Sequence, residues 1–291
     1  VVYGSYTVRE LRPAAGYLEN ETVYPVTVDE NGDVIEISVV NDLIPEIGTT
    51  AAIDDEKEVC ATEVFTLTDT VEYKHLVPGK EYTLKGILMD KATGEPFLQN
   101  GEQITSEVTF VPEAPSGSVE VLFTFDAKLI KADTNIVVFE SLYSDSKELT
   151  VHADIEDDEQ TVTVIVPEIK TEASTDGKKE TTIGGEITIE DIVSYHNLTP
   201  GKEYVVKGTL MNKTTGKPVT VNDEPVTAEA AFTPETRDGE VKATFTFNSY
   251  VITETTDVVV FESLYREEIE IAVHADIEDE GQSVTVYVPE I

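Results

Sequence analysis

Short stretches in which apolar and polar residues alternate recur along the whole chain, and glycine and proline separate them. Because successive side chains of a β-strand point to opposite faces, this alternation predicts strands that are buried on one side. No stretch keeps an apolar period of about 3.6 residues over the length of a helix. The clearest predicted strands are rich in β-branched and aromatic residues and span residues 65–73, 82–88, 119–125, 136–143 and 161–166. The chain is therefore predicted to be all-β.

The sequence repeats itself with an offset of 122 residues. Residues 76–82 read Leu-Val-Pro-Gly-Lys-Glu-Tyr and residues 198–204 read Leu-Thr-Pro-Gly-Lys-Glu-Tyr, which gives the offset as 198 − 76. Two further motifs, Val-Val-Phe-Glu-Ser-Leu-Tyr and Val-His-Ala-Asp-Ile-Glu-Asp, recur with the same offset, from residues 137 and 259 and from residues 151 and 273. About seven short strands in a repeat of this length are typical of an immunoglobulin-like β-sandwich. We therefore expect tandem sandwich domains.

The triplet Pro-Glu-Ile marks the expected domain boundaries. It opens the two repeats and then occurs a third time, at residues 45–47, 167–169 and 289–291. We predict one domain at 45–166 and another at 167–291, with almost no linker between them. Residues 1–44 have no counterpart in the repeats and are too few for a robust core of their own. We expect them to be the C-terminal half of a further domain.

Four polar side chains of each repeat fall on a predicted apolar face. In the first repeat they are Thr49, Asp69, Glu140 and Gln160, and in the second they are Thr171, Asp191, Glu262 and Gln282. A buried carboxylate costs several kcal/mol of folding free energy unless it is paired or protonated. Two inward acids in each repeat therefore indicate a use for them. A buried hydrogen-bonded network that only fixes the strand register would explain the same pattern.

Histidine adds to this pattern. Of the four histidines, only His152 and His274 are related by the repeat offset, and each stands eight residues before the inward glutamine, 160 − 152 and 282 − 274. By strict alternation, His152 lies on the face opposite Val151. It would need a β-bulge or a strand end to reach the core.

A hydroxyl, an imidazole, two carboxyls and a carboxamide are the groups that an acyl transfer requires. An imidazole can take the proton of a threonine hydroxyl, which is a weak nucleophile until then. A carboxyl in apolar surroundings has a raised pKa, and once protonated it can donate a hydrogen bond to the glutamine carbonyl. Attack of the hydroxyl on the carboxamide would expel ammonia and leave a Thr–Gln ester. The pattern leaves open whether Asp69 pairs with Glu140 or orients His152.

Both repeats resemble the VaFE repeats of Gram-positive surface adhesins, which are ester-bond-forming immunoglobulin-like domains. The matching motifs are Pro-x-Ile-x-Thr, Asp-x-Val-x-Tyr, Leu-x-Pro-Gly-Lys-Glu-Tyr, Val-Val-Phe-Glu-Ser-Leu and His-Ala-Asp-Ile-x-Asp-x-x-Gln. The resemblance implies one ester between Thr49 and Gln160 and another between Thr171 and Gln282. It implies assisting roles in bond formation for Asp69, Glu140, His152, Asp191, Glu262 and His274. Thr50 follows Thr49 but lies off the apolar face, so Thr49 is the expected partner.

Residues 1–44 resemble the second half of a collagen-adhesin B-type (CnaB-like) domain. The matching segments are Gly-Ser-Tyr-Thr-Val-Arg-Glu at 4–10, Pro-Ala-Ala-Gly-Tyr at 13–17 and Ile-Ser-Val-Val-Asn at 37–41. The resemblance implies that Glu10 and Asn41 are the acid and the acyl group of a Lys–Asn isopeptide bond. The lysine would lie in the first half of that domain, so we expect no intramolecular bond within residues 1–44.

The composition excludes several classes of function. Lys and Arg number 20 against 58 Asp and Glu, so the formal net charge is −38. Such a surface would repel phosphate backbones and anionic lipids, and we expect neither nucleic acid nor membrane contact. Cys60 is the only cysteine, which excludes a disulfide within the chain and argues against a zinc or thiol redox site. We expect no cofactor and no metal.

The expected function is structural. An ester between the first and last strands of each repeat would carry tension past the rest of the domain, as suits the stalk of a bacterial cell-surface adhesin. We expect a monomer whose partners are the neighbouring stalk domains, with a host ligand bound elsewhere in a secreted, cell-wall-anchored full-length protein. No secretory signal is visible in the sequence, so we expect an internal piece of that protein. Each domain would react once with itself, so the chain would not be an enzyme.

Three other functions fit some of the same residues. A hydrolase could use the same threonine, histidine and acids, although each repeat supplies its own glutamine as the acyl partner. A calcium-dependent adhesion module could use the acidic run at residues 154–159, but no EF-hand spacing is present. The repeats could also bind a ligand directly, on which the sequence is silent.

Overall fold

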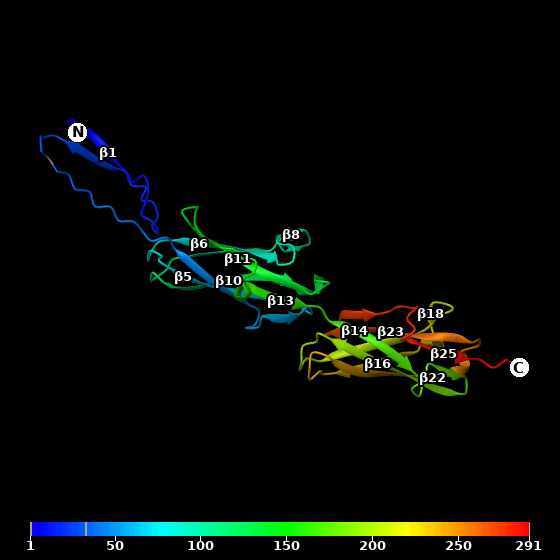
Figure 1. Ribbon diagram of the computed structural model, residues 1–291. Coiled ribbons are helices and arrows are strands. Elements are labelled where there is room, and N and C mark those ends of the chain that lie inside the picture. Colours follow the sequence, from blue (N-terminus) through cyan, green and yellow to red (C-terminus); the bar gives the residue numbers. More distant parts are fainter. Residues whose placement is uncertain (1, 33, 291) are drawn as a thin grey trace. The chain divides into compact units, whose positions relative to one another are not determined.

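The computed structural model describes residues 2–32 and 34–290 (Figure 1). Ile291, which ends the third Pro-Glu-Ile triplet, lies outside the described residues. Strands make up nearly all of the regular structure, and the helical elements of these ranges are short 3-10 turns: η1 Ala127–Leu129, η2 Asp158–Gln160 and η3 Ser249–Val251. No helix in the described part of the chain is long and apolar enough to cross a membrane. The prediction of an all-β chain is confirmed.

The first repeat forms two β-sheets. The smaller sheet has the order β10-β5-β3, with β10 Gly117–Asp126, β5 Val64–Lys74 and β3 Glu46–Ala52. The larger has the order β4-β13-β11-β6-β9, and β12 also pairs with β11. Its strands are β4 Glu58–Cys60, β6 Tyr82–Asp90, β9 Thr105–Phe110, β11 Thr134–Ser144, β12 Lys147–His152 and β13 Thr161–Ile165. β7 Leu98–Gln99 pairs with β8 Glu102–Gln103. The five predicted strands are all present, as β5, β6, β10, β11 and β13.

The second repeat has the same arrangement. Its smaller sheet has the order β14-β16-β22, with β14 Glu168–Ser174, β16 Glu186–His196 and β22 Gly239–Asn248. The larger has the order β15-β25-β23-β17-β18, and β21 and β24 add to β17 and β23. Its strands are β15 Glu180–Thr182, β17 Tyr204–Asn212, β18 Lys217–Pro218, β21 Thr227–Phe232, β23 Thr256–Arg266, β24 Ile269–His274 and β25 Ser283–Tyr287. β19 Thr220–Val221 and β20 Glu224–Pro225 pair with each other as a separate two-stranded sheet.

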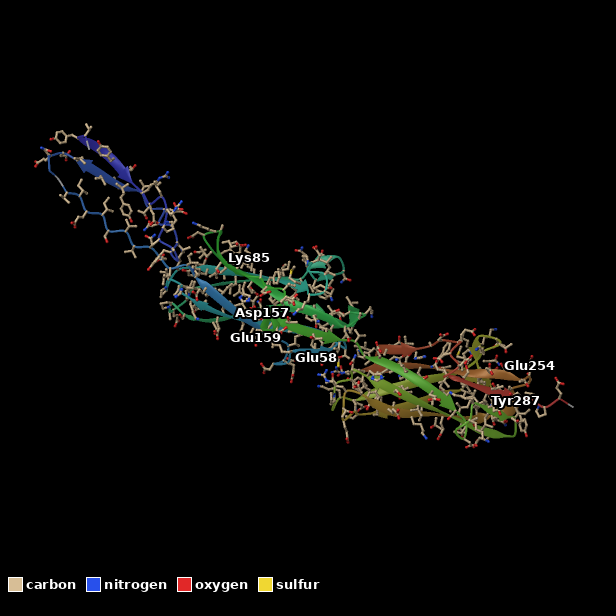
Figure 2. All side chains as sticks on the ribbon, in the orientation of Figure 1. Glu58, Lys85, Asp157, Glu159, Glu254 and Tyr287 are labelled. Carbon is tan, nitrogen blue, oxygen red and sulfur yellow. The ribbon has the colours of Figure 1, made fainter. Side chains whose placement is uncertain are left out.

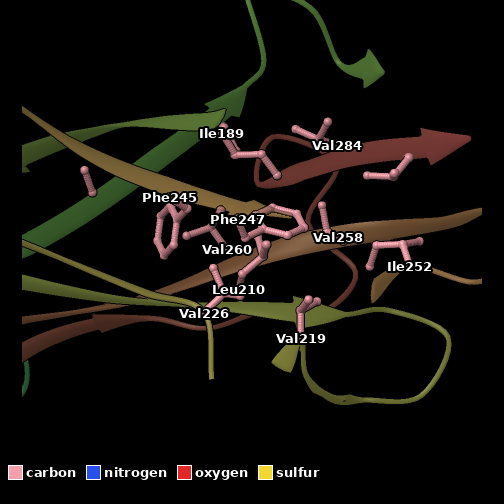
Figure 3. Packing of buried hydrophobic residues seen from close by; sticks show 13 residues of the cluster. Ile189, Leu210, Val219, Val226, Phe245, Phe247, Ile252, Val258, Val260 and Val284 are labelled. Atoms are coloured by element: carbon pink, nitrogen blue, oxygen red, sulfur yellow. The ribbon is translucent and has the colours of Figure 1, made fainter. Parts of the chain in front are cut away.

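Inward side chains from both sheets form the core of the second repeat (Figure 3). Phe245 and Phe247 alternate along β22 and are buried against Val258 and Val260 of β23 and Leu210 of β17. Residues two apart on one strand share a face, so the apolar half of each alternating pattern is removed from water together. Full burial of a side chain of this size stabilises the fold by about 1.5–3 kcal/mol.

The N-terminal segment has little core. β1 Gly4–Val8 pairs antiparallel with β2 Tyr24–Val28, and Tyr17 forms an isolated bridge with Leu43. Tyr6 and Val8 remain 38% and 43% exposed although both lie on a strand. A two-stranded hairpin is marginally stable at best unless another face covers it.

Candidate functional site

The inward threonine and glutamine of each repeat meet directly. Thr49 lies on β3, Gln160 ends η2 just before β13, and both side chains are buried. The Gln160 Nε2 amide donates a hydrogen bond to Thr49 Oγ1. In the second repeat Gln282 Nε2 donates to Thr171 Oγ1 at 2.7 Å. Thr50, by contrast, is exposed, as its place off the apolar face predicts.

Two buried carboxyls stand beside this pair in the first repeat. Asp69 of β5 and Glu140 of β11 are 0% and 1% exposed. Burial, together with the charge of Asp69, raises the pKa of Glu140 to about 9. Burial raises the pKa of Asp69 to about 6, although Glu140, Thr49 and His152 each act to lower it. Near neutral pH the two acids are therefore expected to share one proton.

The second repeat shows the same division between its two acids. Burial, followed by the neighbouring Asp191, raises the pKa of Glu262 to about 10, with Thr171 and Gln282 acting in the opposite direction. Burial also raises the pKa of Asp191. In each repeat the two inward acids therefore lie close enough to act on each other's pKa.

Unsatisfied polar atoms concentrate at these two places. Among the described residues, the fully buried side-chain oxygens and nitrogens without a hydrogen-bond partner are those of the acid pairs and the glutamine carbonyls: both carboxyl oxygens of Asp69, Glu140, Asp191 and Glu262, and Oε1 of Gln160 and Gln282. Native structures satisfy most buried polar groups, so ten exceptions in two equivalent sites need an explanation. A proton held within each acid pair would satisfy two of these oxygens, and the glutamine carbonyls remain open to a donor.

His152 reaches the site from the end of β12, where it pairs across the sheet with Glu140. Val151 and His152 do lie on opposite faces, but Val151 is the outward one, at 53% exposed, so His152 faces inward beside Glu140 with no bulge between the two residues. His152 Nε2 lies 2.9 Å from Asp157 Oδ2, and Nδ1 lies 3.4 Å from the carbonyl oxygen of Ile47. Within the described residues, the structure does not bring the ring into hydrogen-bond contact with Thr49.

The partner of this histidine, Asp157, is a site residue that sequence reasoning missed. Its hydrogen bond with His152 lowers the pKa of the Asp157 carboxyl. His274 and Asp279 repeat the contact at 2.9 Å, and the pKa of Asp279 is lowered for the same reason. The signal was present in the sequence, because the histidine and an aspartate five residues later recur in both copies. It was hidden in an acidic run that also suggested calcium ligands.

Three other acids of that run have partners of their own. Lys91 Nζ lies 3.6 Å from Glu156 and 3.4 Å from Asp158, and the Asp154 side chain accepts from the backbone N–H of Glu156. Across the described ranges, no group of three or more His, Cys, Asp and Glu side chains is arranged to hold a metal ion.

The two candidate residues of the N-terminal segment are also together. Asn41 Nδ2 donates to both carboxylate oxygens of Glu10 at 2.8 Å and to the carbonyl of Leu18 at 3.1 Å. The backbone N–H of Asn20 donates to Glu10 as well, at 2.8 Å. An acid beside an asparagine carboxamide is the arrangement that the resemblance to CnaB-like domains implies.

Comparison with known proteins gives two family matches. The T-Q ester bond containing domain matches residues 45–164 and 167–286, and a prealbumin-like fold domain matches residues 1–43. No curated protein matches the chain in sequence.

Among the solved structures that match the chain, the three described next have low identity and TM-scores below 0.5. A bacterial adhesin from Mobiluncus mulieris, containing intramolecular disulfide, isopeptide and ester bond cross-links, is 16% identical, with 75% of this chain and 80% of that chain covered and a TM-score of 0.40. A second crystal form of that adhesin is 14% identical, covers 84% and 98% of the two chains and has a TM-score of 0.41. The major pilin subunit of Bacillus cereus is 13% identical, with 100% and 85% of the two chains covered and a TM-score of 0.31.

Proposed function

The chain belongs to the family of T-Q ester bond containing domains, and we propose on this basis that each repeat crosslinks itself through a Thr–Gln ester. The observation that carries the proposal is the hydrogen bond from the glutamine amide to the threonine hydroxyl, found in both repeats across a separation of 111 residues. The two groups that would react are already in contact in a buried site. Proximity of this kind replaces the entropy loss of a bimolecular encounter.

In the proposed reaction, Oγ1 of Thr49 attacks Cδ of Gln160. The ionised Asp69 accepts the hydroxyl proton, and the protonated Glu140 donates a hydrogen bond to the carbonyl oxygen as negative charge develops there. The C–N bond of the carboxamide then breaks, and the amide nitrogen leaves as ammonia with the proton that came from the threonine. One ester and one ammonia are formed from one hydroxyl and one carboxamide.

His152 would support this reaction through charge. Its ring is held by Asp157 and favours the ionised form of Asp69, the group that we propose as the base. Thr171, Gln282, Asp191, Glu262, His274 and Asp279 would have the same roles in the second repeat. Each domain would react once, with itself, so we do not propose an enzyme.

The position of the bond suits a load-bearing domain. β3 is the first strand of its repeat and β13 the last, and they belong to different sheets, so an ester from Thr49 to Gln160 would tie the two sheets together. Tension applied at one end of the domain would pass through the ester. It would not pull apart the strands that lie between β3 and β13 in the chain. We propose that the repeats form part of the stalk of a bacterial cell-surface adhesin.

Intact mass under denaturing conditions tests the proposal. Two esters predict a mass lower than that of the unmodified sequence by two ammonias, with peptides containing Thr49 and Gln160 recovered as one linked species. Mild alkaline hydrolysis should separate the linked peptides, since it cleaves esters and spares amides. A mass equal to that of the unmodified sequence would refute the proposal.

A further inference from the structure

One lysine of each repeat reaches the backbone on both sides of the proposed bond. Lys57 follows β3 in the chain, and its Nζ donates to the carbonyl of Ala51 at 2.6 Å and to the carbonyl of Glu159 at 2.5 Å. Ala51 lies on β3, two residues after Thr49, and Glu159 immediately precedes Gln160. The ammonium group therefore joins the strand of the threonine to the turn of the glutamine. Figure 2 shows Glu159 close to Asp157 in this part of the first repeat.

The second repeat has the same contacts. Lys179 Nζ donates to the carbonyl of Ala173 at 2.7 Å and to the carbonyl of Gly281 at 2.6 Å. The residue before the glutamine is a glutamate in one repeat and a glycine in the other, so the lysine recognises the backbone there and not a side chain. The Gly281 carbonyl also accepts from the backbone N–H of Ala173 at 2.9 Å, so a backbone hydrogen bond joins β14 to the turn before Gln282.

We propose that Lys57 and Lys179 are positioning residues for ester formation, each holding the peptide beside the reacting glutamine against the strand that carries the reacting threonine. This inference rests on the proposed ester and adds residues that neither touch the reacting atoms nor belong to the acid pair. Only a long side chain with several N–H donors can reach two carbonyls at once, which is what the ammonium of lysine supplies.

The charge of the lysine supports the same role. The ammonium favours the ionised form of Asp69 in the first repeat, as that of Lys179 does for Asp191 in the second. Burial lowers the pKa of Lys57, and the acids around it, Glu159, Asp69, Asp157 and Asp158, act in the opposite direction. An ionised aspartate is the form that can accept the threonine proton. The lysine would thus set both the approach of the glutamine and the charge of the base.

The experiment compares rates of bond formation in variants of the full chain. Newly synthesised protein is quenched in acid at timed intervals, and the ester of each repeat is followed by peptide mass. We expect Lys57→Met to slow the first ester at least tenfold and to leave the second unchanged. Lys57→Arg, which keeps the charge and several donors, should restore at least half of the wild-type rate.

Lys85 supplies the matched control. It also recurs in the second repeat, as Lys207, but its Nζ lies on the surface, 3.2 Å from Glu107 (Figure 2). Lys85→Met should form both esters at the wild-type rate. A wild-type rate in Lys57→Met would overturn the inference while leaving the ester itself established, whereas a wild-type chain without esters would overturn the proposed function first.

Folding without the bond separates positioning from general stability. Hydrogen exchange in the first repeat is compared between Thr49→Ala and the double variant Thr49→Ala, Lys57→Met. If β5 and β11 are equally protected from hydrogen exchange in both variants, the result supports a positioning role for Lys57. Loss of that protection in the double variant would show that the lysine only keeps the repeat folded, and the positioning role would be wrong.

Discussion

Gly86 of β6 lies directly opposite Glu140 of β11, and no side chain would fit between them. A Cβ atom at this glycine would lie 2.5 Å from Oε1 of Glu140 and 2.4 Å from Cζ of Phe123. In the second repeat Gly208 faces Glu262, and a Cβ there would lie 2.4 Å from Cζ of Phe245. The missing side chain provides the space that the buried carboxyl occupies.

Gly86→Ala should therefore displace Glu140 or Phe123. Overpacking of this kind costs about 1–3 kcal/mol of stability. We expect the first ester to form at least tenfold more slowly, with the second unchanged, as measured by peptide mass. Gly48→Ala is the control, because Gly48 lies on β3 beside Thr49 but a Cβ there meets nothing within 4 Å. Equal rates in the two variants would show that the space beside Glu140 is not needed.

Thr49→Ala and Gln160→Ala should each abolish the first ester and leave the second. The mass deficit should fall from two ammonias to one, because the acids, glutamine and threonine of the other repeat are untouched. In the chain-entropy model, losing a crosslink that closes a loop of about 100 residues costs about 4–5 kcal/mol. The midpoint of urea unfolding of the first repeat measures this loss. Thr50→Ala serves as the control, and loss of both esters from one substitution would contradict independent domains.

Some residues of the site can be predicted from the sequence, and others cannot. Thr49, Asp69, Glu140 and Gln160 could be placed inward because the strands around them keep regular alternation. His152 could not, because an apolar neighbour suggests which face of a strand is inward, and the apolar Val151 beside it is exposed.

Three further residues of the site, Asp157, Lys57 and Gly86, cannot be predicted from the sequence for other reasons. Asp157 and Lys57 lie in connecting segments, where no period relates position to direction. Gly86 gives no signal within a strand, since alternation concerns side chains. Loop chemistry and close packing depend on which segments meet in space, and only the structure shows that.

The contact between His152 and Asp157 predicts a graded loss of rate. His152→Ala should remove the ring that favours ionised Asp69, and we expect the first ester to form at least tenfold more slowly in a repeat that still folds. Asp157→Asn keeps the shape but weakens the hold on the ring, so its rate should lie between those of His152→Ala and the wild type. Glu156→Gln is the control, since Glu156 lies on the surface and pairs with Lys91 instead. Wild-type kinetics in His152→Ala would remove the histidine from the reaction.

The raised pKa of Glu140 predicts how stability changes with pH. In Thr49→Ala the acid pair is retained without the bond, and Glu140 binds its proton up to about pH 9 in the folded state. The ordinary value is near 4.5, so the folded state holds the extra proton between these limits. The stabilising contribution is then fully present below the ordinary pKa and is lost as the pH rises through the folded value.

Adding Glu140→Gln to Thr49→Ala should remove most of this dependence, because the amide does not titrate. We expect the difference in unfolding free energy between the two variants to change by at least about 1.4 kcal/mol, the equivalent of one pKa unit. The change should occur between about pH 5 and about pH 9, a range that includes the raised pKa of Asp69, about 6, and reaches that of Glu140, about 9. Urea unfolding at several pH values measures it, and the comparison cancels the acids that lie away from this pair. Parallel curves for the two variants would show that Glu140 titrates normally.

The same two carboxyls predict a bell-shaped pH profile for the rate of ester formation. The reaction needs Asp69 ionised and Glu140 protonated, so the first ester should form fastest between about pH 6 and about pH 9. Below this window Asp69 cannot accept the threonine proton, and above it Glu140 cannot donate to the glutamine carbonyl. The pKa of Glu262 is raised as well, so the second ester should also form more slowly at alkaline pH. Both esters form in the same molecule and can be followed in the same quenched samples, so each repeat serves as the reference for the other. A rate that rises steadily with pH in both repeats would mean that a protonated carboxyl takes no part.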